Sequence, residues 1–132
     1  MHCFVRKESY DSVTIYWLDR EGARQAFREA SERLVQVCPE VYAVYLFGSL
    51  ARNEATPRSD ADLLVLLRHS ERPIWKDRYL DYTPYFERVG MPFDLFCYTL
   101  EEVPSVPLAR SALREAVLLA GQPYLLEEAQ QR

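Results

Sequence analysis

Three short apolar runs, each long enough for one buried β-strand, constrain the fold of this 132-residue chain more than any other feature. They span Val41–Phe47, Leu63–Leu67 and Phe93–Tyr98 and consist mainly of branched aliphatic and aromatic residues. Because both faces of each run are apolar, we expect strands in the middle of a sheet. None of them approaches the roughly 20 residues that a membrane-spanning helix needs.

A helix is predicted before the first apolar run. Five apolar residues recur at three- and four-residue steps over Arg20–Val37, which puts them on one helical face. Asp19 offers an N-cap, and Pro39 ends the helix. The β-branched and aromatic stretch Tyr10–Leu18 is predicted to be a strand that precedes it. The five apolar positions are Ala23, Phe27, Ala30, Leu34 and Val37.

Two more helical patterns follow the second and third apolar runs. Pro73–Val89 is aromatic and mostly helical in pattern, but Pro84 should kink or split this helix, and Gly90 ends it. Leu108–Leu119 is predicted to be the last helix, with Gly121 at its C-terminal end. The order of strands and helices therefore predicts an α/β (α+β) domain, in which helices flank a small mixed central sheet.

Length and composition narrow the class of protein. The chain is 48% hydrophobic and 27% charged, which suits one globular domain over residues 1–132. A net charge of −4 argues against nucleic acid as the main partner, since phosphate binding needs clustered Lys and Arg. The N-terminus lacks the apolar region of a signal peptide. We therefore expect a cytoplasmic domain with no membrane partner.

Gly48 and Ser49 come directly after the first apolar run and are predicted to open a short helix. The free backbone N–H groups at such a start, together with the Ser49 hydroxyl, would form a site for a phosphate. Gly48 would let the backbone approach the phosphate closely, because glycine has no Cβ atom. Taken alone, a Gly-Ser pair after a strand is also common in ordinary loops.

Three carboxylates accompany the other two apolar runs. Asp60 and Asp62 flank the start of one strand, where side-chain alternation points both to the same face. Asp94 lies within the third run, where a buried carboxylate is costly unless it is paired, hydrogen-bonded or metal-bound. Such oxygen ligands suit Mg²⁺, which takes one or two carboxylates together with substrate phosphates. Alternatively, Asp60 and Asp62 could be solvated in a turn, and Asp94 could accept backbone hydrogen bonds.

Together these residues resemble the signature of the minimal nucleotidyltransferases, a branch of the DNA polymerase beta superfamily. The resemblance lies in a Gly-Ser turn, an Asp-x-Asp pair at a fixed distance from it, and a third Asp on a later strand. It covers about residues 41–98, the motif core. The matching positions are Gly48, Ser49, Ala51, Arg52, Ala55, Ser59, Asp60, Asp62, Leu63, Leu64, Val65 and Asp94.

One position departs from the family pattern. The family usually has Gly directly after the Ala-Arg pair, where this chain has Asn53. Asn is the non-glycine residue that best tolerates a left-handed backbone conformation, so we expect the turn to be retained.

The resemblance implies a nucleotidyltransferase fold and the transfer of a nucleoside monophosphate from an NTP, here ATP, to a hydroxyl group. By the same resemblance, Asp60, Asp62 and Asp94 would hold two Mg²⁺ ions. Asp94 would also help to deprotonate the acceptor hydroxyl.

The resemblance also implies the residues that contact the nucleotide. Gly48 and Ser49 would bind the phosphates that leave. Arg52 would add positive charge beside them, although it could equally face solvent or pair with Glu54.

A partner protein is implied as well. Minimal nucleotidyltransferases of this length typically pair with HEPN-domain proteins in toxin–antitoxin modules, and some transfer AMP to a tyrosine of the toxin. The chain would then be a protein adenylyltransferase that acts as an antitoxin. Two alternatives stay open: an antitoxin that neutralises its partner by binding alone, and a transferase that acts on a small-molecule hydroxyl.

Two groups of aromatic residues have no assigned role in the predicted nucleotide site. The group between Trp75 and Phe86 has helical spacing and is predicted mainly to be core, with a partner-binding face or a base-stacking platform as alternatives. Tyr10, Tyr16 and Trp17 near the N-terminus could mediate self-association, which would make the protein a homo-oligomer. The members of the first group are Trp75, Tyr79, Tyr82, Tyr85 and Phe86.

Overall fold

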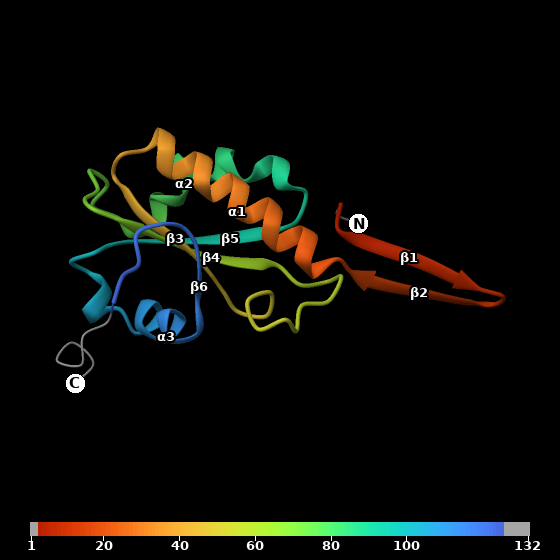
Figure 1. The fold of residues 1–132 in the computed structure, drawn as a ribbon. Coiled ribbons are helices and arrows are strands. Elements are labelled where there is room, and N and C mark those ends of the chain that lie inside the picture. Colours follow the sequence, from red (N-terminus) through yellow and green to blue (C-terminus); the bar gives the residue numbers. More distant parts are fainter. Residues whose placement is uncertain (1–2, 126–132) are drawn as a thin grey trace.

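A computed structural model describes residues 3–125 and has a four-stranded sheet at its centre (Figure 1). The sheet has the strand order β5-β4-β3-β6. β4 and β5 run parallel, and the other neighbouring pairs are antiparallel, so the sheet is mixed as predicted. The strands are β3 (Val41–Phe47), β4 (Ala61–Leu67), β5 (Phe93–Thr99) and β6 (Val117–Gly121).

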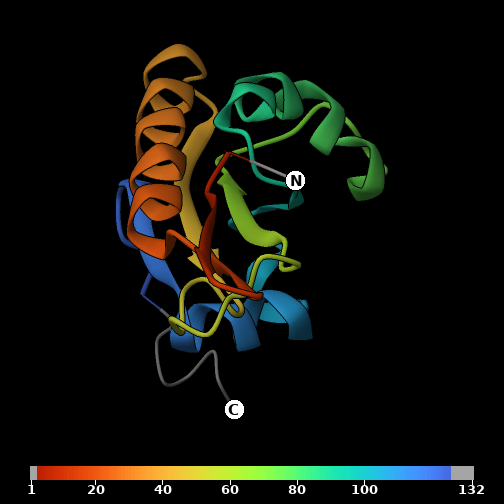
Figure 2. The same ribbon diagram turned by 90° about the vertical axis from the view of Figure 1, so that its right-hand side faces the viewer.

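Helices cover both faces of this sheet (Figure 2). Helix α1 (Arg20–Val37) and the segment 75–89 lie on one face, and α3 (Pro107–Glu115) lies on the other. The side chains of β4 alternate between the two layers, with Leu63 and Val65 in the α1 layer and Leu64 in the α3 layer. The predicted α/β class is therefore confirmed.

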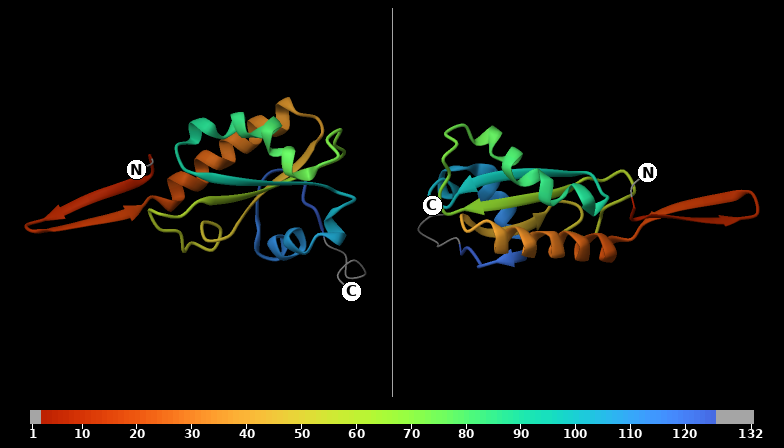
Figure 3. Two further views of the ribbon diagram at one scale, coloured as in Figure 1. Left: turned by 180° about the vertical axis from the view of Figure 1, so that it is seen from behind. Right: turned by 90° about the horizontal axis from the view of Figure 1, so that it is seen from above.

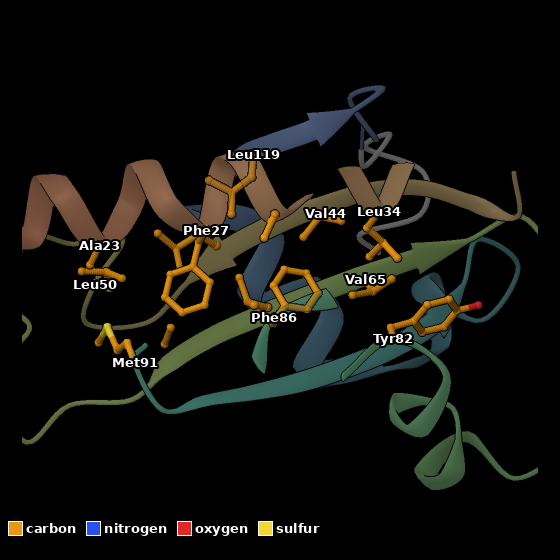
Figure 4. Packing of buried hydrophobic residues seen from close by; sticks show 14 of the residues in the cluster. Ala23, Phe27, Leu34, Val44, Leu50, Val65, Tyr82, Phe86, Met91 and Leu119 are labelled. Carbon is orange, nitrogen blue, oxygen red and sulfur yellow. The ribbon is translucent and has the colours of Figure 1, made fainter. Parts of the chain in front are cut away.

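Helix α1 begins and ends where the sequence predicts. The Asp19 carboxylate accepts a hydrogen bond from the Gly22 N–H at 3.0 Å and so caps the helix. Phe27 is fully buried, and its ring packs against that of Phe86 at a centroid distance of 6.4 Å (Figure 4). Val37 is an exception to the predicted buried face, because it occupies the exposed last turn of the helix.

The strand predicted over Tyr10–Leu18 is confirmed only for its second part, Val13–Leu18, and the strand before it was missed. The segment forms a hairpin of β1 (Val5–Tyr10) and β2 (Val13–Leu18), which projects from the rest of the molecule (Figure 3). Asp11 in the connecting turn has a left-handed φ of +49°. The sequence pattern does not predict β1, because this exposed strand contains charged residues and no apolar run.

The last predicted helix is too long. α3 ends at Glu115, and the apolar residues that follow form β6, which pairs with β3. Gly121 has a φ of +88°, but it lies at the end of this strand and not at a helix end. A Cβ atom there would lie 2.3 Å from the Tyr42 carbonyl oxygen, so glycine allows β6 to approach β3.

The middle helical pattern is split, as Pro84 predicts. It consists of α2 (Tyr79–Tyr82) and three single-turn 3₁₀ segments, and Gly90 ends it with a φ of +90°. Among its aromatic residues, Tyr82 and Phe86 are buried in the core, as predicted. Trp75 and Tyr79 are exposed, so the core interpretation is wrong for these two. No helix within residues 3–125 has the length and apolar character needed to cross a bilayer.

Candidate active site

The Gly-Ser turn and Asp62 meet at one end of the sheet, on the side that α3 covers. β3 ends at Phe47, which is the register partner of Asp62 at the start of the antiparallel strand β4. The residue after Phe47, Gly48, therefore lies beside the Asp62 side chain. A strand end and a strand start thus bring together residues that are far apart in the sequence.

Gly48 is required by this close approach. Its φ of +77° is in the left-handed region, and a Cβ atom built there would lie 2.3 Å from an Asp62 carboxylate oxygen. Any larger residue would have to displace the Asp62 side chain. The position of the Asp62 side chain therefore depends on a glycine at position 48.

The short helix predicted after Gly48 is absent, and the segment 48–53 is a series of turns. The Arg52 N–H donates to the Gly48 carbonyl oxygen at 3.1 Å, and the Glu54 N–H donates to the Ser49 carbonyl oxygen at 2.8 Å. Asn53 has a φ of +62°, which turns the chain before a helix can continue. The predicted left-handed tolerance of Asn53 is thus confirmed, and the predicted helix start is wrong.

Two arginines of α1 hold this turn segment in place. The Arg24 guanidinium donates to the Leu50 carbonyl oxygen at 3.3 Å and to the Asn53 side-chain oxygen at 3.2 Å. Arg20 donates to the Ala55 carbonyl oxygen at 2.8 Å. Sequence reasoning missed both contacts, because the polar face of a helix gives no sign of the loop against which it packs.

The three predicted carboxylates lie around the same end of the sheet. Asp62 and Asp94 are register partners on the parallel strands β4 and β5, and Asp60 immediately precedes β4. Burial raises the pKa of the Asp62 carboxyl, repulsion by Asp94 and Asp60 raises it further, and Arg52 lowers it in part. Asp94 is exposed and not buried as expected, because β5 is an edge strand of the sheet.

The donor set of this site fits Mg²⁺ better than a transition metal. Residues 3–125 contain no group of three Cys, His, Asp or Glu side chains that could hold a metal by themselves. Asp62 and Asp94 supply two carboxylates, which is the number that Mg²⁺ commonly uses when substrate phosphates complete its shell. A cation beside Asp62 would also offset the repulsion that raises its pKa.

A cleft of about 580 Å³ opens beside Asp62. The turn 48–52 forms one wall, and α3 forms the other with residues spaced three and four apart on one helical face. The sequence contains this spacing, but the spacing alone does not show that α3 lies against the turn, so it could not identify the cleft wall. The residues that α3 contributes are Leu108, Ser111, Ala112 and Glu115.

Arg52 spans the mouth of this cleft. Its guanidinium lies 3.4 Å from a Glu54 carboxylate oxygen and 3.0 Å from one of Glu115 on α3. The predicted alternative of a Glu54 pair is therefore present, and the pair with Glu115 was not predicted. An exposed ion pair of this kind is weak, so an anionic ligand in the cleft could compete for Arg52.

Gly48→Ala should disturb the site more than the fold. We expect a loss of about 1–3 kcal/mol in the free energy of unfolding, because alanine is strained at a left-handed φ. Gly48→Asn relieves most of that strain but keeps the Cβ atom, so it should recover stability without recovering function. Thermal unfolding and a transferase assay on both variants would measure this, and an active Gly48→Asn protein would contradict the close contact with Asp62.

The sequence comparison identifies the class of domain. Residues 24–119 match the sequence model of the nucleotidyltransferase domain, and the chain belongs to this family. Comparison with curated proteins gives no significant match.

Solved structures agree with the fold. A crystal structure from Sulfolobus solfataricus, assigned as a nucleotidyltransferase, has a TM-score of 0.57 and 21% identity, covering 75% of this chain and 80% of that one. A toxin-antitoxin crystal structure with AMP-PNP has a TM-score of 0.52 and 17% identity, covering 86% and 79%. At these identities the likeness shows the fold alone, and the predicted nucleotidyltransferase fold is confirmed.

Proposed function

We propose that the chain is a Mg²⁺-dependent nucleotidyltransferase that transfers AMP from ATP to a hydroxyl, on a tyrosine of a HEPN-type toxin partner. Residues 1–132 would act as one cytoplasmic domain with an antitoxin role. The observation that carries the proposal is the contact between Gly48 and Asp62, with Asp94 as the register neighbour of Asp62. Family membership supports the transfer chemistry, and the toxin-antitoxin likeness is consistent with the partner.

The proposed reaction is a displacement at phosphorus. The acceptor oxygen forms a bond to the α-phosphorus of ATP, the bond from that phosphorus to the bridging oxygen breaks, and pyrophosphate leaves. Asp94 takes the proton of the acceptor hydroxyl, for which its exposed position is suitable. Asp60, Asp62 and Asp94 would hold Mg²⁺ only together with the phosphates of ATP, whose charge the bound ion would neutralise.

The other cleft residues would orient the nucleotide. Gly48 and Ser49 line the cleft, and their backbone N–H groups and the Ser49 hydroxyl would donate hydrogen bonds to the leaving phosphates. Arg52 would exchange its Glu115 partner for a phosphate oxygen.

The test uses ATP labelled on its α-phosphate, Mg²⁺ and a purified HEPN-domain toxin. We expect label on a tyrosine of that protein, dependent on Mg²⁺. ATP labelled on the γ-phosphate is the matched control and should transfer nothing, because that phosphate leaves with pyrophosphate. Transfer of the γ-label would overturn the proposed chemistry.

The same assay separates the two alternatives. A toxin that is neutralised without acquiring label would favour an antitoxin that acts by binding alone. Label on a small-molecule hydroxyl without any protein partner would favour a small-molecule transferase.

A further inference from the structure

The β1–β2 hairpin is an addition to the family domain. It lies outside residues 24–119, which match the family, and it extends beyond the N-terminal end of α1 (Figures 1 and 3). Within residues 3–125, β1 and β2 pair only with each other. A two-stranded hairpin is marginally stable in water unless a further strand or a packed face supports it.

One face of the hairpin carries four exposed apolar or aromatic side chains, beside Arg6 and Glu8, which the register sets opposite Trp17 and Ile15. The register puts Tyr10 opposite Val13, and places Ile15 and Trp17 on the same face two and four residues further along β2. The four side chains are 43–58% exposed. Tyr16, on the other face, is 49% exposed. This concentration of apolar surface on a projecting element indicates an interaction surface.

The two outer edges of the hairpin differ in charge. β1 carries Arg6, Lys7 and Glu8, and charged residues protect an edge strand against pairing. β2 has no charged residue and no proline, and consists almost entirely of β-branched and aromatic residues. The β2 edge is therefore the one suited to accept another strand.

The backbone of β2 has free groups at this edge. A two-residue turn makes Tyr10 and Val13 a hydrogen-bonded pair, so the backbone groups of Val13, Ile15 and Trp17 face β1. By alternation, the N–H and C=O groups of Thr14 and Tyr16 point outward. These are the groups that a further antiparallel strand would bond.

We infer that two copies of this chain pair through their β2 edges, antiparallel about a two-fold axis at Ile15, to form a four-stranded sheet. This register sets Thr14 opposite Tyr16 of the second copy, where the outward backbone groups meet. It also sets Val13 opposite Trp17, a favourable β-branched–aromatic pair. Pairing through β1 would instead set Lys7 opposite Lys7 or Glu8 opposite Glu8.

The charge of the hairpin favours a second copy as the occupant. The whole chain has a net charge of −4, but residues 5–18 contain two basic and two acidic residues and are neutral. Two acidic chains can therefore approach through their hairpins without a net charge on either segment.

Sedimentation of the purified chain tests this inference. We expect the wild type at twice the 15.5 kDa of one chain, and Ile15→Lys at the mass of one chain, because two lysines would face each other at the axis. Ser9→Lys adds the same charge to the exposed β1 strand and should remain a dimer. Circular dichroism confirms folding of each variant. A monomeric wild type, or a dimeric Ile15→Lys protein, would overturn the inference.

Cross-linking tests the register independently. In a Cys3→Ser background, Ile15→Cys should form an intermolecular disulfide on mild oxidation, because residues directly opposite in antiparallel strands have Cβ atoms about 5 Å apart. Ser9→Cys, on the other strand, is the matched control and should stay reduced. Equal cross-linking at both positions would reject the β2 register.

Discussion

Asp62→Asn should lower the rate of AMP transfer by at least about 10²–10³-fold, the loss typical of removing one electrostatic group from an active site. Asp62 is the only one of the three carboxylates that lines the cleft, among the residues that the structure describes. It is also the one that touches the Gly48 turn. Asparagine keeps the size of the side chain but cannot supply the charge that Mg²⁺ requires. The measurement is the labelled transfer assay described above.

The same substitution should leave the metal-free fold intact or stabilise it. Because the pKa of Asp62 is raised in the folded protein, its ionised form opposes folding at neutral pH. Asparagine removes that charge, so the midpoint of thermal unfolding in EDTA should stay equal or rise by up to about 3 °C. Addition of Mg²⁺ and ATP should then raise the midpoint of the wild type but not of the variant.

Asp11→Asn is the matched control for this experiment. It makes the same chemical change in the hairpin turn, far from the cleft, where asparagine tolerates the left-handed φ. It should retain transfer activity. If Asp62→Asn instead unfolds several degrees earlier than the wild type, then Asp62 has a structural role. If the variant retains transfer, then the proposed site is wrong.

The sequence predicts correctly those elements whose apolar residues follow the spacing of a helix or the length of a buried strand, but not both. α1 has apolar residues at helical steps and polar ones between them. β3 is a continuous apolar run, and so is β4 from Leu63 to Leu67. Local patterns of this kind survive in the fold because the sheet needs the same buried residues. For the site, the sequence singles out both Gly48 and Asp62, but their direct proximity is visible only in the structure.

The failures occur where a distant partner decides the structure. Residues 116–120 are apolar at every position, so they fit a helix or a strand equally well, and only pairing with β3 makes them β6. The expectation that Asp94 is buried failed because no local feature tells an edge strand from a central one. The contact between Arg52 and Glu115 joins residues 63 positions apart, which spacing cannot reveal.

Glu102→Gln should produce the largest loss of stability that we predict, about 2–3 kcal/mol or roughly 6–10 °C in the unfolding midpoint. The Arg78 side chain is only 5% exposed, and its guanidinium contacts both oxygens of Glu102, at 2.5 and 3.1 Å. Glutamine leaves that buried charge without a counter-ion. We expect a smaller loss of unfolding free energy than for a fully buried pair, because Glu102 is 37% exposed and solvent screens its charge. Glu101→Gln, one residue earlier and exposed, should cause almost no change.

The pH dependence of this loss identifies the ion pair as its cause. The hydrogen bond from Arg78, assisted by the Thr99 N–H, lowers the pKa of Glu102 below its usual value of 4.5. Since the folded-state pKa is the lower one, the pair contributes its full stability above pH 4.5 and loses it as the pH falls through the folded-state value.

The difference in the free energy of unfolding between wild type and Glu102→Gln should therefore be greatest at neutral pH and shrink below pH 4.5, where Glu102 itself becomes protonated. Urea unfolding of both proteins across this range measures the difference directly. A difference that stays constant from neutral to acidic pH would mean that glutamine acts through packing, and that the charge of Glu102 does not stabilise the buried Arg78.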